Sequence, residues 1–162
     1  MRIGILQPGY LPWLGFFEQM HKSDAFVIYD DVQYDKEGWR NRNRIKTAHG
    51  VQWLTVPVIV KFDVHPLITE VMIDNKKNWG EKHFSSIQQN YSKSPFYKKY
   101  IGMFEGVYSK EWQYLVDIDM HFILELSVLL GIDCNKIVRS STLRVSGDRS
   151  ERLVNICKLF KA

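Results

Sequence analysis

Residues 25–45, AFVIYDDVQYDKEGWRNRNRI, decide the fold class of this chain. The apolar run over residues 25–29 has the composition of a buried β-strand. Asp30 and Asp31 follow that run directly, and arginines alternate with asparagines from Arg40 to Arg44. Because ligands of open α/β sheets bind beyond the carboxyl ends of the strands, this stretch predicts a strand with a ligand site beside it. The alternative is a solvated loop in which the charges pair with each other.

The rest of the chain alternates between strand-like and helix-like segments. Pro12 suits the first turn of a helix, and Gly131 is typical of the end of one. The order of segments predicts the α/β class, as a Rossmann-like, three-layer domain with a mostly parallel sheet and a helical second half. We expect a single domain over residues 1–162. We expect further strands over residues 2–6, 53–60, 67–73 and 134–139, and helices over residues 11–22, 78–91, 94–108, 112–130 and 150–161.

The composition narrows the classes of partner. The chain has 162 residues, and its 45% hydrophobic and 25% charged residues are ordinary for a globular protein. A net charge of +4 suits an anionic small molecule, but it is too weak to indicate nucleic acid, and we expect no nucleic acid partner. The two cysteines, Cys134 and Cys157, are far apart in apolar surroundings, which suits free thiols in a reducing compartment.

Several sequence patterns are absent. No apolar run reaches the ~20 residues that a membrane-spanning helix needs, and the N-terminus lacks the apolar core of a signal peptide. We therefore expect a cytoplasmic protein with no membrane insertion. The HExxH, nucleophile-elbow and P-loop motifs are also absent, which argues against zinc hydrolases, α/β-hydrolases and P-loop enzymes.

Polar residues near the predicted strand ends are the candidate substrate-binding groups. The turn between the first strand and the first helix offers backbone N–H groups that favour phosphate or carboxylate. Arginine forks match the same anions, and on an extended segment Arg42 and Arg44 would share one face while the neighbouring asparagines share the other. We expect an anion site between this turn and residues 30–44. The candidates are Gln7, Tyr10, Gln33, Trp39, Asn41, Arg42, Asn43, Arg44 and Asn90.

Three residues are candidate catalytic groups: His83, Asp30 and Asp31. A histidine with a pKa near neutral is a natural acid or base, and a carboxylate can act as a general base. Paired carboxylates can also hold a divalent cation, but we assign no metal and leave the cofactor unknown. The structural alternatives are that one aspartate caps a turn while the other pairs with an arginine, and that His83 packs in the core.

The chain resembles the WbqC-like protein family over nearly its whole length. The resemblance implies a bacterial protein associated with the biosynthesis of surface polysaccharide (O-antigen), and for one branch of the family a transfer of glycine or another aminoacyl group to a sugar has been suggested. Members usually continue past the last helix found here. We therefore expect that this chain lacks the usual C-terminal segment, exposes a sheet edge beside residues 134–139 and forms a homo-oligomer. The segments that carry the resemblance are MRIGILQPGYLPWLGFFEQM, FVIYDDVQYDKEGWRNRNRI, WLTVP, NWGEKHFSSIQQNYSKSPF and ERLVNICKLF.

Three functions remain open. The first is an enzyme that transfers an aminoacyl (glycyl) or acyl group to an amino sugar or nucleotide sugar, with an anionic small molecule as its substrate or donor. The second is a non-catalytic module that binds a nucleotide sugar or a partner enzyme. The third is a nucleotidylyltransferase-like enzyme. Residues 7–10 weakly resemble the HIGH-type opening of that class without its histidines, and residues 139–144, RSSTLR, resemble its ISSTxxR pattern or are a plain polar run.

Overall fold

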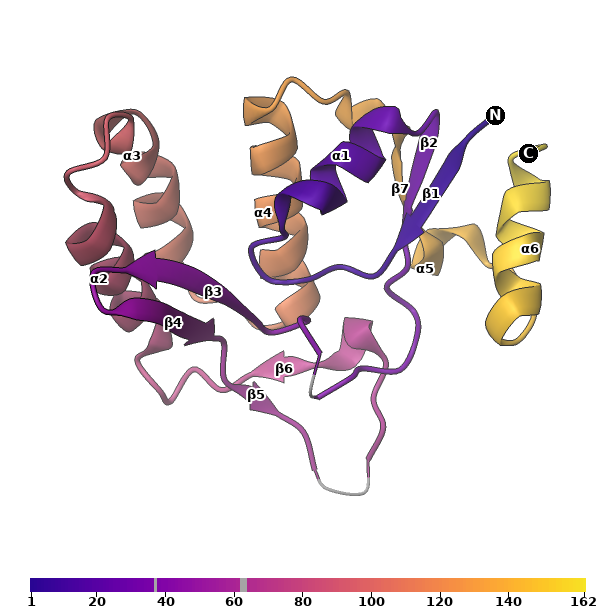
Figure 1. Ribbon diagram of the computed structural model, residues 1–162. Coiled ribbons are helices and arrows are strands. Elements are labelled where there is room, and N and C mark those ends of the chain that lie inside the picture. The colour runs from indigo at the N-terminus through magenta and orange to yellow at the C-terminus, as the bar shows by residue number, and fades with distance from the viewer. Residues whose placement is uncertain (37, 62–63) are drawn as a thin grey trace.

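Three parallel strands form the central sheet of the structure, a computed structural model that describes residues 1–36, 38–61 and 64–162 (Figure 1). The strands are β1 (Ile3–Leu6), β2 (Ala25–Ile28) and β7 (Ile137–Arg139), in the order β1-β2-β7. Every residue of β2 is buried, as expected for the middle strand of a parallel sheet. The strands expected over residues 2–6 and 25–29 are therefore confirmed, and the fold is mixed α/β.

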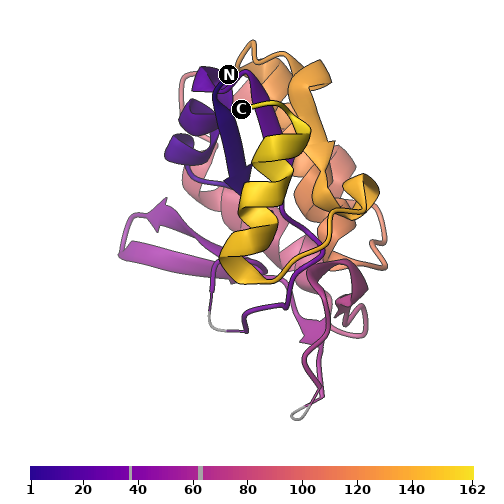
Figure 2. The ribbon, with the colours of Figure 1, turned by 90° about the vertical axis from the view of Figure 1, so that its right-hand side faces the viewer.

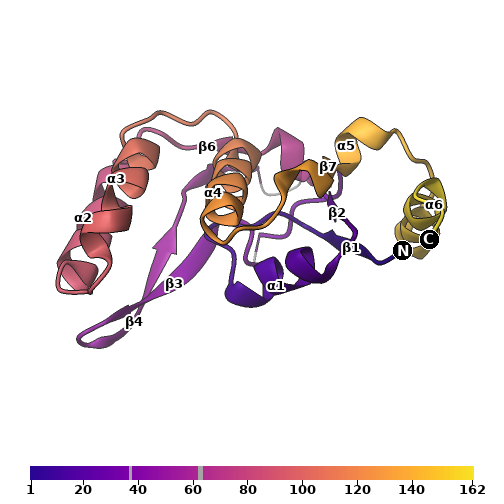
Figure 3. The ribbon, with the colours of Figure 1, turned by 90° about the horizontal axis from the view of Figure 1, so that it is seen from above.

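Helices lie on both faces of this sheet (Figures 2 and 3). Helices α1 (Leu14–Lys22) and α4 (Leu115–Leu129) lie on one face, where Phe26 and Ile28 of β2 share a core cluster with Phe16 and Ile123. Side chains alternate between faces along a strand, so Val27 of β2 points the other way. Helix α6 (Arg149–Leu159), which contains a fully buried isoleucine, lies on that second side.

Outside this sheet the strands pair antiparallel, so the expected mostly parallel sheet is limited to three strands. Strands β3 (Arg42–Thr47) and β4 (Gly50–Thr55) form a hairpin, and β5 (Val58–Ile59) pairs with β6 (Met72–Ile73). Gly50 has a φ of 113°, a left-handed conformation that glycine adopts without steric cost and that permits the tight hairpin turn.

Three of the expected strands have different boundaries in the structure. The strand predicted over residues 53–60 divides before Pro57, which has no amide hydrogen for the ladder of a sheet. Residues 67–73 begin instead with the 3-10 turn η1 (Ile68–Glu70). The strand expected over residues 134–139 likewise begins with the 3-10 turn η2 (Cys134–Lys136), so only its last three residues pair with β2.

The expected helical second half is confirmed. Helices α2 (Trp79–Tyr91) and α3 (Tyr97–Tyr108) precede α4, and their inner faces form the larger core cluster with Leu54 of the hairpin. None of the helices in the described residues has the length and apolar character needed to cross a bilayer. A single short helix, α5 (Ser140–Leu143), follows β7.

Strand β7 pairs only with β2 within the described residues. Its other edge therefore has no strand partner there, and the uncovered edge expected from a missing C-terminal segment remains a prediction. Association between copies of the chain remains a prediction.

Candidate functional site

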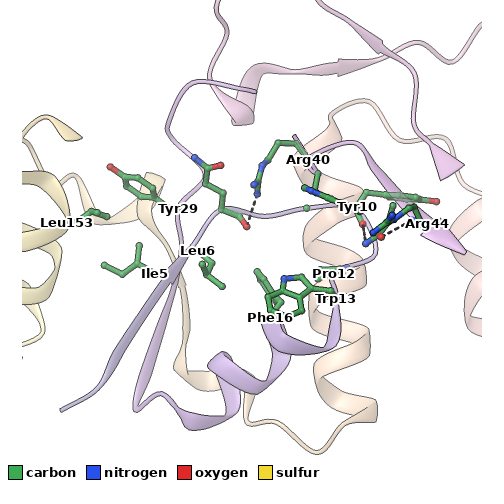
Figure 4. Close-up of a pocket in the computed structure, with 14 residues that line it drawn as sticks. Ile5, Leu6, Tyr10, Pro12, Trp13, Phe16, Tyr29, Arg40, Arg44 and Leu153 are labelled. Atoms are coloured by element: carbon green, nitrogen blue, oxygen red, sulfur yellow. Dashed lines mark hydrogen bonds between the residues drawn. The ribbon is translucent and has the colours of Figure 1, made fainter. Parts of the chain in front are cut away.

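A cleft of about 750 Å³ lies beside the carboxyl end of β1 (Figure 4). Its volume is within the range of small-molecule sites in proteins. The walls come from β1 and the turn after it, the start of α1, the residue after β2, the segment that leads into β3, the first residues of β3, and α6. The lining residues are Ile5, Leu6, Gln7, Gly9, Tyr10, Pro12, Trp13, Phe16, Tyr29, Trp39, Arg40, Asn43, Arg44 and Leu153.

The turn after β1 is extended because α1 begins at Leu14, later than the sequence predicted. Gly9 allows this turn to approach the segment before β3, since a Cβ atom there would lie 2.8 Å from the carbonyl oxygen of Trp39. The Gln7 side chain lines the cleft, and no other described residue hydrogen-bonds to it. Its amide is therefore available to a ligand.

Arg40 connects the two segments that form the cleft. Its Nη1 donates to the carbonyl oxygens of Pro8 at 2.9 Å and Gln7 at 3.3 Å, and the Tyr10 amide donates to the Arg40 carbonyl at 3.0 Å. Burial lowers the pKa of the Arg40 guanidinium from its usual value. The first turn thus contacts the segment that contains Arg40, with Arg40 and Arg44 as the cations at the cleft, and the anion site expected there remains a prediction.

Arg44 packs against two indole rings, that of Trp39, which lines the cleft, and that of Trp53, which lies outside the cleft lining. Its guanidinium carbon lies 5.0 Å from the centre of the Trp39 ring and 5.4 Å from that of Trp53, and the two rings are 5.1 Å apart. Trp39 is 45% exposed, so a ligand in the cleft can reach its ring. Arg42 also packs on Trp53, at 5.0 Å, but it does not line the cleft.

The two asparagines of this segment lie on the opposite side from the arginines, as the alternation predicted. Asn43 donates to the carbonyl oxygens of Leu11 at 2.6 Å and Tyr10 at 3.3 Å, and Asn41 donates to that of Val56 at 2.8 Å. Asn43 lines the cleft, whereas Asn41 is buried outside it. Both amides stabilise the backbone of the site.

The far end of the cleft is more apolar. Tyr29, which follows β2, lies there with Ile5 and with Leu153 of α6 (Figure 4). The Arg152 guanidinium carbon lies 5.3 Å from the centre of the Tyr29 ring. The cleft therefore has a cationic, indole-lined end and an apolar end with one phenol.

Asp30 lies at the end of β2 but outside the cleft lining. It is fully buried and accepts hydrogen bonds from Arg139 Nε at 2.5 Å and from both the amide and the hydroxyl of Ser141 at 3.0 Å. Asp31 accepts from the Ser140 hydroxyl and from Arg152. The arginine-paired alternative therefore describes both aspartates, which link β2 to β7, α5 and α6. A catalytic role for either aspartate remains a prediction.

His83 lies in a buried polar group away from the cleft lining. Its Nδ1 is hydrogen-bonded to the Tyr10 hydroxyl at 2.9 Å, and that hydroxyl also bonds to the Tyr108 hydroxyl. Burial lowers the pKa of His83 to about 4, against the effect of a hydrogen bond with the Thr55 backbone. His83 is 6% exposed and borders a separate hollow of about 360 Å³. The core-packed alternative fits this environment.

The remaining candidates lie apart from the cleft. Gln33 forms an isolated β-bridge with Leu67, and Asn90 donates to the Ser86 carbonyl on α2 at 2.8 Å. Within the described ranges no three carboxylate, histidine or thiol groups gather where they could hold a metal ion.

Several residues of the site were missing from the sequence-based candidates. Tyr29 and Arg40 stood in the quoted stretch, where their exposure to a cleft could not be predicted. The polar run after β7 was interpreted either as an ISSTxxR-like pattern or as a plain polar run, and its serines contact both aspartates. The residues missed are Trp13, Tyr29, Arg40, Arg139, Ser140, Ser141, Arg152 and Leu153.

Comparisons with known proteins identify relatives of this chain. The WbqC-like protein family matches residues 7–162. A protein of Mycobacterium tuberculosis, named "Uncharacterized protein Rv1507c", is 35% identical over 158 residues, which are 97% of this chain and 68% of that protein. No solved structure matches the chain.

Proposed function

This chain belongs to the WbqC-like protein family, and we propose that it binds a nucleotide sugar, or a similar anion with a flat ring, in the cleft beside β1. One observation carries the proposal: two arginines, the exposed indole rings of Trp13 and Trp39, and the unbonded amide of Gln7 line one cleft. Three parallel strands with helices on both faces support a Rossmann-like interpretation of this half of the chain.

Each part of the cleft suits a part of such a ligand. Guanidinium groups bind phosphate oxygens with two parallel hydrogen bonds, and Arg44 is exposed at the cleft wall. The Trp39 ring offers a flat apolar face to a base or a sugar ring. Gln7 can donate to and accept from sugar hydroxyls. The phosphates would lie at the arginines and the rest of the ligand toward Tyr29.

We further propose a role in surface-polysaccharide biosynthesis, as a transferase of an aminoacyl (glycyl) or acyl group to an amino sugar or nucleotide sugar. In that reaction the sugar amine attacks the acyl carbonyl carbon, a C–N bond forms, the carrier leaves with its bonding electrons, and the amine loses a proton. The cleft would contribute by holding the reactants in the productive orientation. The unpaired thiols of Cys134 and Cys157 support a reducing, cytoplasmic location.

A second candidate is a non-catalytic nucleotide-sugar-binding module. Among the described residues that line the cleft there is no carboxylate, histidine, lysine or cysteine to accept the proton. The carboxylates that follow Tyr29 of the cleft, Asp30 and Asp31, are bonded to arginines and serines instead. A transferase would have to pass the proton to water or to the leaving group. A binding module needs no such acceptor.

A thermal-shift screen tests the proposal. Nucleotide sugars, aminoacyl donors and nucleoside triphosphates are each added with and without magnesium, since a ligand that binds only the folded state raises the melting temperature by mass action. We expect a nucleotide sugar to raise it without magnesium. A response to triphosphates only in the presence of magnesium would instead support the nucleotidylyltransferase-like alternative.

A turnover assay then separates the first two candidates. The nucleotide sugar that binds is incubated with aminoacyl and acyl donors, and the N-acylated product is measured by mass spectrometry. Product formation above the uncatalysed rate supports the transferase. Binding without product supports the module.

A further inference from the structure

A second hollow, of about 300 Å³, lies between α2, α3 and β3, and we call it the apolar groove. Its walls are aliphatic or aromatic apart from Ser94, and they include Ile45 of β3, Ile87 of α2 and Phe104 of α3. No charged side chain lines it among the residues the structure describes. Phe96, at its rim, is 66% exposed. Such a groove favours a chain of methylene groups over a polar ligand.

The apolar groove and the cleft share a wall. Leu11 lines the groove, while its neighbours Tyr10 and Pro12 line the cleft. Leu11 has a φ of 48°, a left-handed conformation that is unfavourable for a residue with a side chain. Asn43 holds this backbone by its 2.6 Å hydrogen bond to the Leu11 carbonyl. Strained residues of this kind gather at binding sites, and here the strain directs Leu11 into the groove.

The surface around the apolar groove is predominantly basic. Residues 38–55 and 79–108, which supply most of the groove's walls, contain eight lysines or arginines and two acidic residues, Glu81 and Glu105. The rest of the chain carries 14 basic residues and 16 acidic ones. Figure 1 shows the β3–β4 hairpin together with α2 and α3 at one end of the molecule. That end therefore attracts anions.

Four exposed lysines are next to, or one residue from, lining residues of the groove in the sequence. Lys46 follows Ile45, and its backbone amide donates to the Tyr91 hydroxyl at 3.1 Å. The others are Lys93, Lys98 and Lys99. Among the described residues none of these four forms an ion pair with a carboxylate. An apolar groove on a predominantly basic part of the surface matches one chain with an anionic end.

We infer that the apolar groove binds the alkyl chain of a single-chain anionic amphiphile, with its phosphate or carboxylate on the flanking lysines. The small volume suits one chain of medium length. A peptide would bring backbone N–H and C=O groups against walls that offer almost no partners for them. This site is additional to the proposed nucleotide-sugar cleft, and it does not depend on what the cleft binds.

Isothermal titration calorimetry with hexyl, octyl and decyl phosphate, each below its critical micelle concentration, tests the inference. Each added methylene should tighten binding about fourfold until the chain fills the groove. Decyl phosphate should bind more tightly than uncharged decyl maltoside at low salt, and the double variant Lys98→Glu/Lys99→Glu should remove that preference. Affinity that is independent of chain length would overturn the inference.

A matched pair of variants locates the binding. Ser94 lines the groove and is exposed, so Ser94→Trp should fill it and weaken decyl phosphate binding by about tenfold or more. Ser92 is also exposed but lies outside the groove, and Ser92→Trp should leave binding unchanged. Equal effects in the two variants would contradict the assignment.

Two further measurements distinguish the amphiphile from a membrane surface and from the ligand of the cleft. Binding to phosphatidylglycerol vesicles without binding to monomeric decyl phosphate would overturn the inference in favour of a membrane surface. The nucleotide-sugar affinity is measured in the same variants and should be the same in both. Loss of decyl phosphate binding alone in Ser94→Trp therefore supports the groove whether or not the cleft proposal succeeds.

Discussion

The cleft beside β1 and the buried polar group of Tyr10, His83 and Tyr108 share one residue but differ in their environment. In the cleft, Arg44 and Trp39 are exposed and the Gln7 amide has no partner among the described residues. In the buried group the hydrogen-bonding atoms bond to one another, and burial keeps His83 uncharged near neutral pH. Residue type alone would rank His83 above Gln7 as a functional group. Exposure and unused hydrogen-bonding capacity reverse that order.

Asp30 resembles the buried polar group in that it is buried and fully hydrogen-bonded within the protein. Its removal should therefore lower the stability of the fold by the largest amount. Asp30→Ala leaves Arg139 and the Ser141 donors without their buried acceptor, so the free energy of unfolding should fall by roughly 3 kcal/mol. Urea denaturation followed by circular dichroism measures this change. Asp30→Asn keeps the shape of the side chain, and its free energy of unfolding should lie between those of Asp30→Ala and the wild type. A change below about 1 kcal/mol together with a loss of turnover would instead indicate a catalytic carboxylate.

His83 should make stability depend on pH. Its pKa is about 4 in the folded state, against the ordinary value of 6.5 that it has in the unfolded chain, so the unfolded state binds more protons between these values. Stability should therefore fall as the pH falls from 6.5 to 4, by roughly 3 kcal/mol in all, and stay level below that window. The difference between wild type and His83→Gln isolates this contribution in urea titrations over pH 3.5 to 8. A constant difference across that range would contradict the buried, neutral histidine.

Arg44 should matter for binding but not for folding. Arg44→Ala removes a charged donor from the cleft, and nucleotide-sugar affinity should fall by about tenfold or more. The melting temperature should barely change, because exposed substitutions shift stability by about 0.5 kcal/mol or less. Arg42→Ala is the matched control, since Arg42 packs on the same Trp53 ring outside the cleft lining. Equal losses of affinity in both variants, measured by calorimetry, would place the ligand on the hairpin face instead.

Asp119 of α4 should affect stability in the opposite direction to Asp30. Both carboxyl oxygens are buried, and neither has a hydrogen-bond partner in the described parts of the chain. Burial raises the pKa of Asp119 well above its usual value, so the folded state retains a proton that the unfolded chain releases as the pH rises above about 4. Asp119→Asn removes that penalty and should stabilise the protein at pH 7 but not at pH 3.5. A less stable variant at pH 7 would mean that Asp119 is ionised beside Arg40.

Local patterns predicted the parts of the fold and site that depend on local chemistry. Apolar runs predicted β1 and β2, and the helical spacing of apolar residues predicted α2 to α4. The alternation of arginine and asparagine predicted that Arg42 and Asn43 lie on opposite faces of their segment. The β3–β4 hairpin was missed because β3 carries three charged residues and does not form an apolar run, and only the end of β4 fell within the strand expected over residues 53–60.

The burial of single polar side chains could not be predicted from local patterns. His83 and Asp30 both contact partners that are distant in sequence. His83 bonds to Tyr10, and Asp30 bonds to residues 139–141. Ser140 and Ser141 come close to Asp30 only because β7 pairs with β2. Sequence spacing contains no information about that pairing.

The indole N–H resonances of the tryptophans test the central claim, that the ligand binds in the cleft and not beside His83. Trp13 and Trp39 line the cleft, whereas the indole N–H of Trp79 donates to Asn75 at 3.2 Å and that of Trp112 donates to the Val107 carbonyl at 2.9 Å. A nucleotide sugar titrated into ¹⁵N-labelled protein should shift the Trp13 and Trp39 signals and leave the Trp79 and Trp112 signals in place. Shifts confined to Trp79, which borders the hollow at His83, would contradict the account.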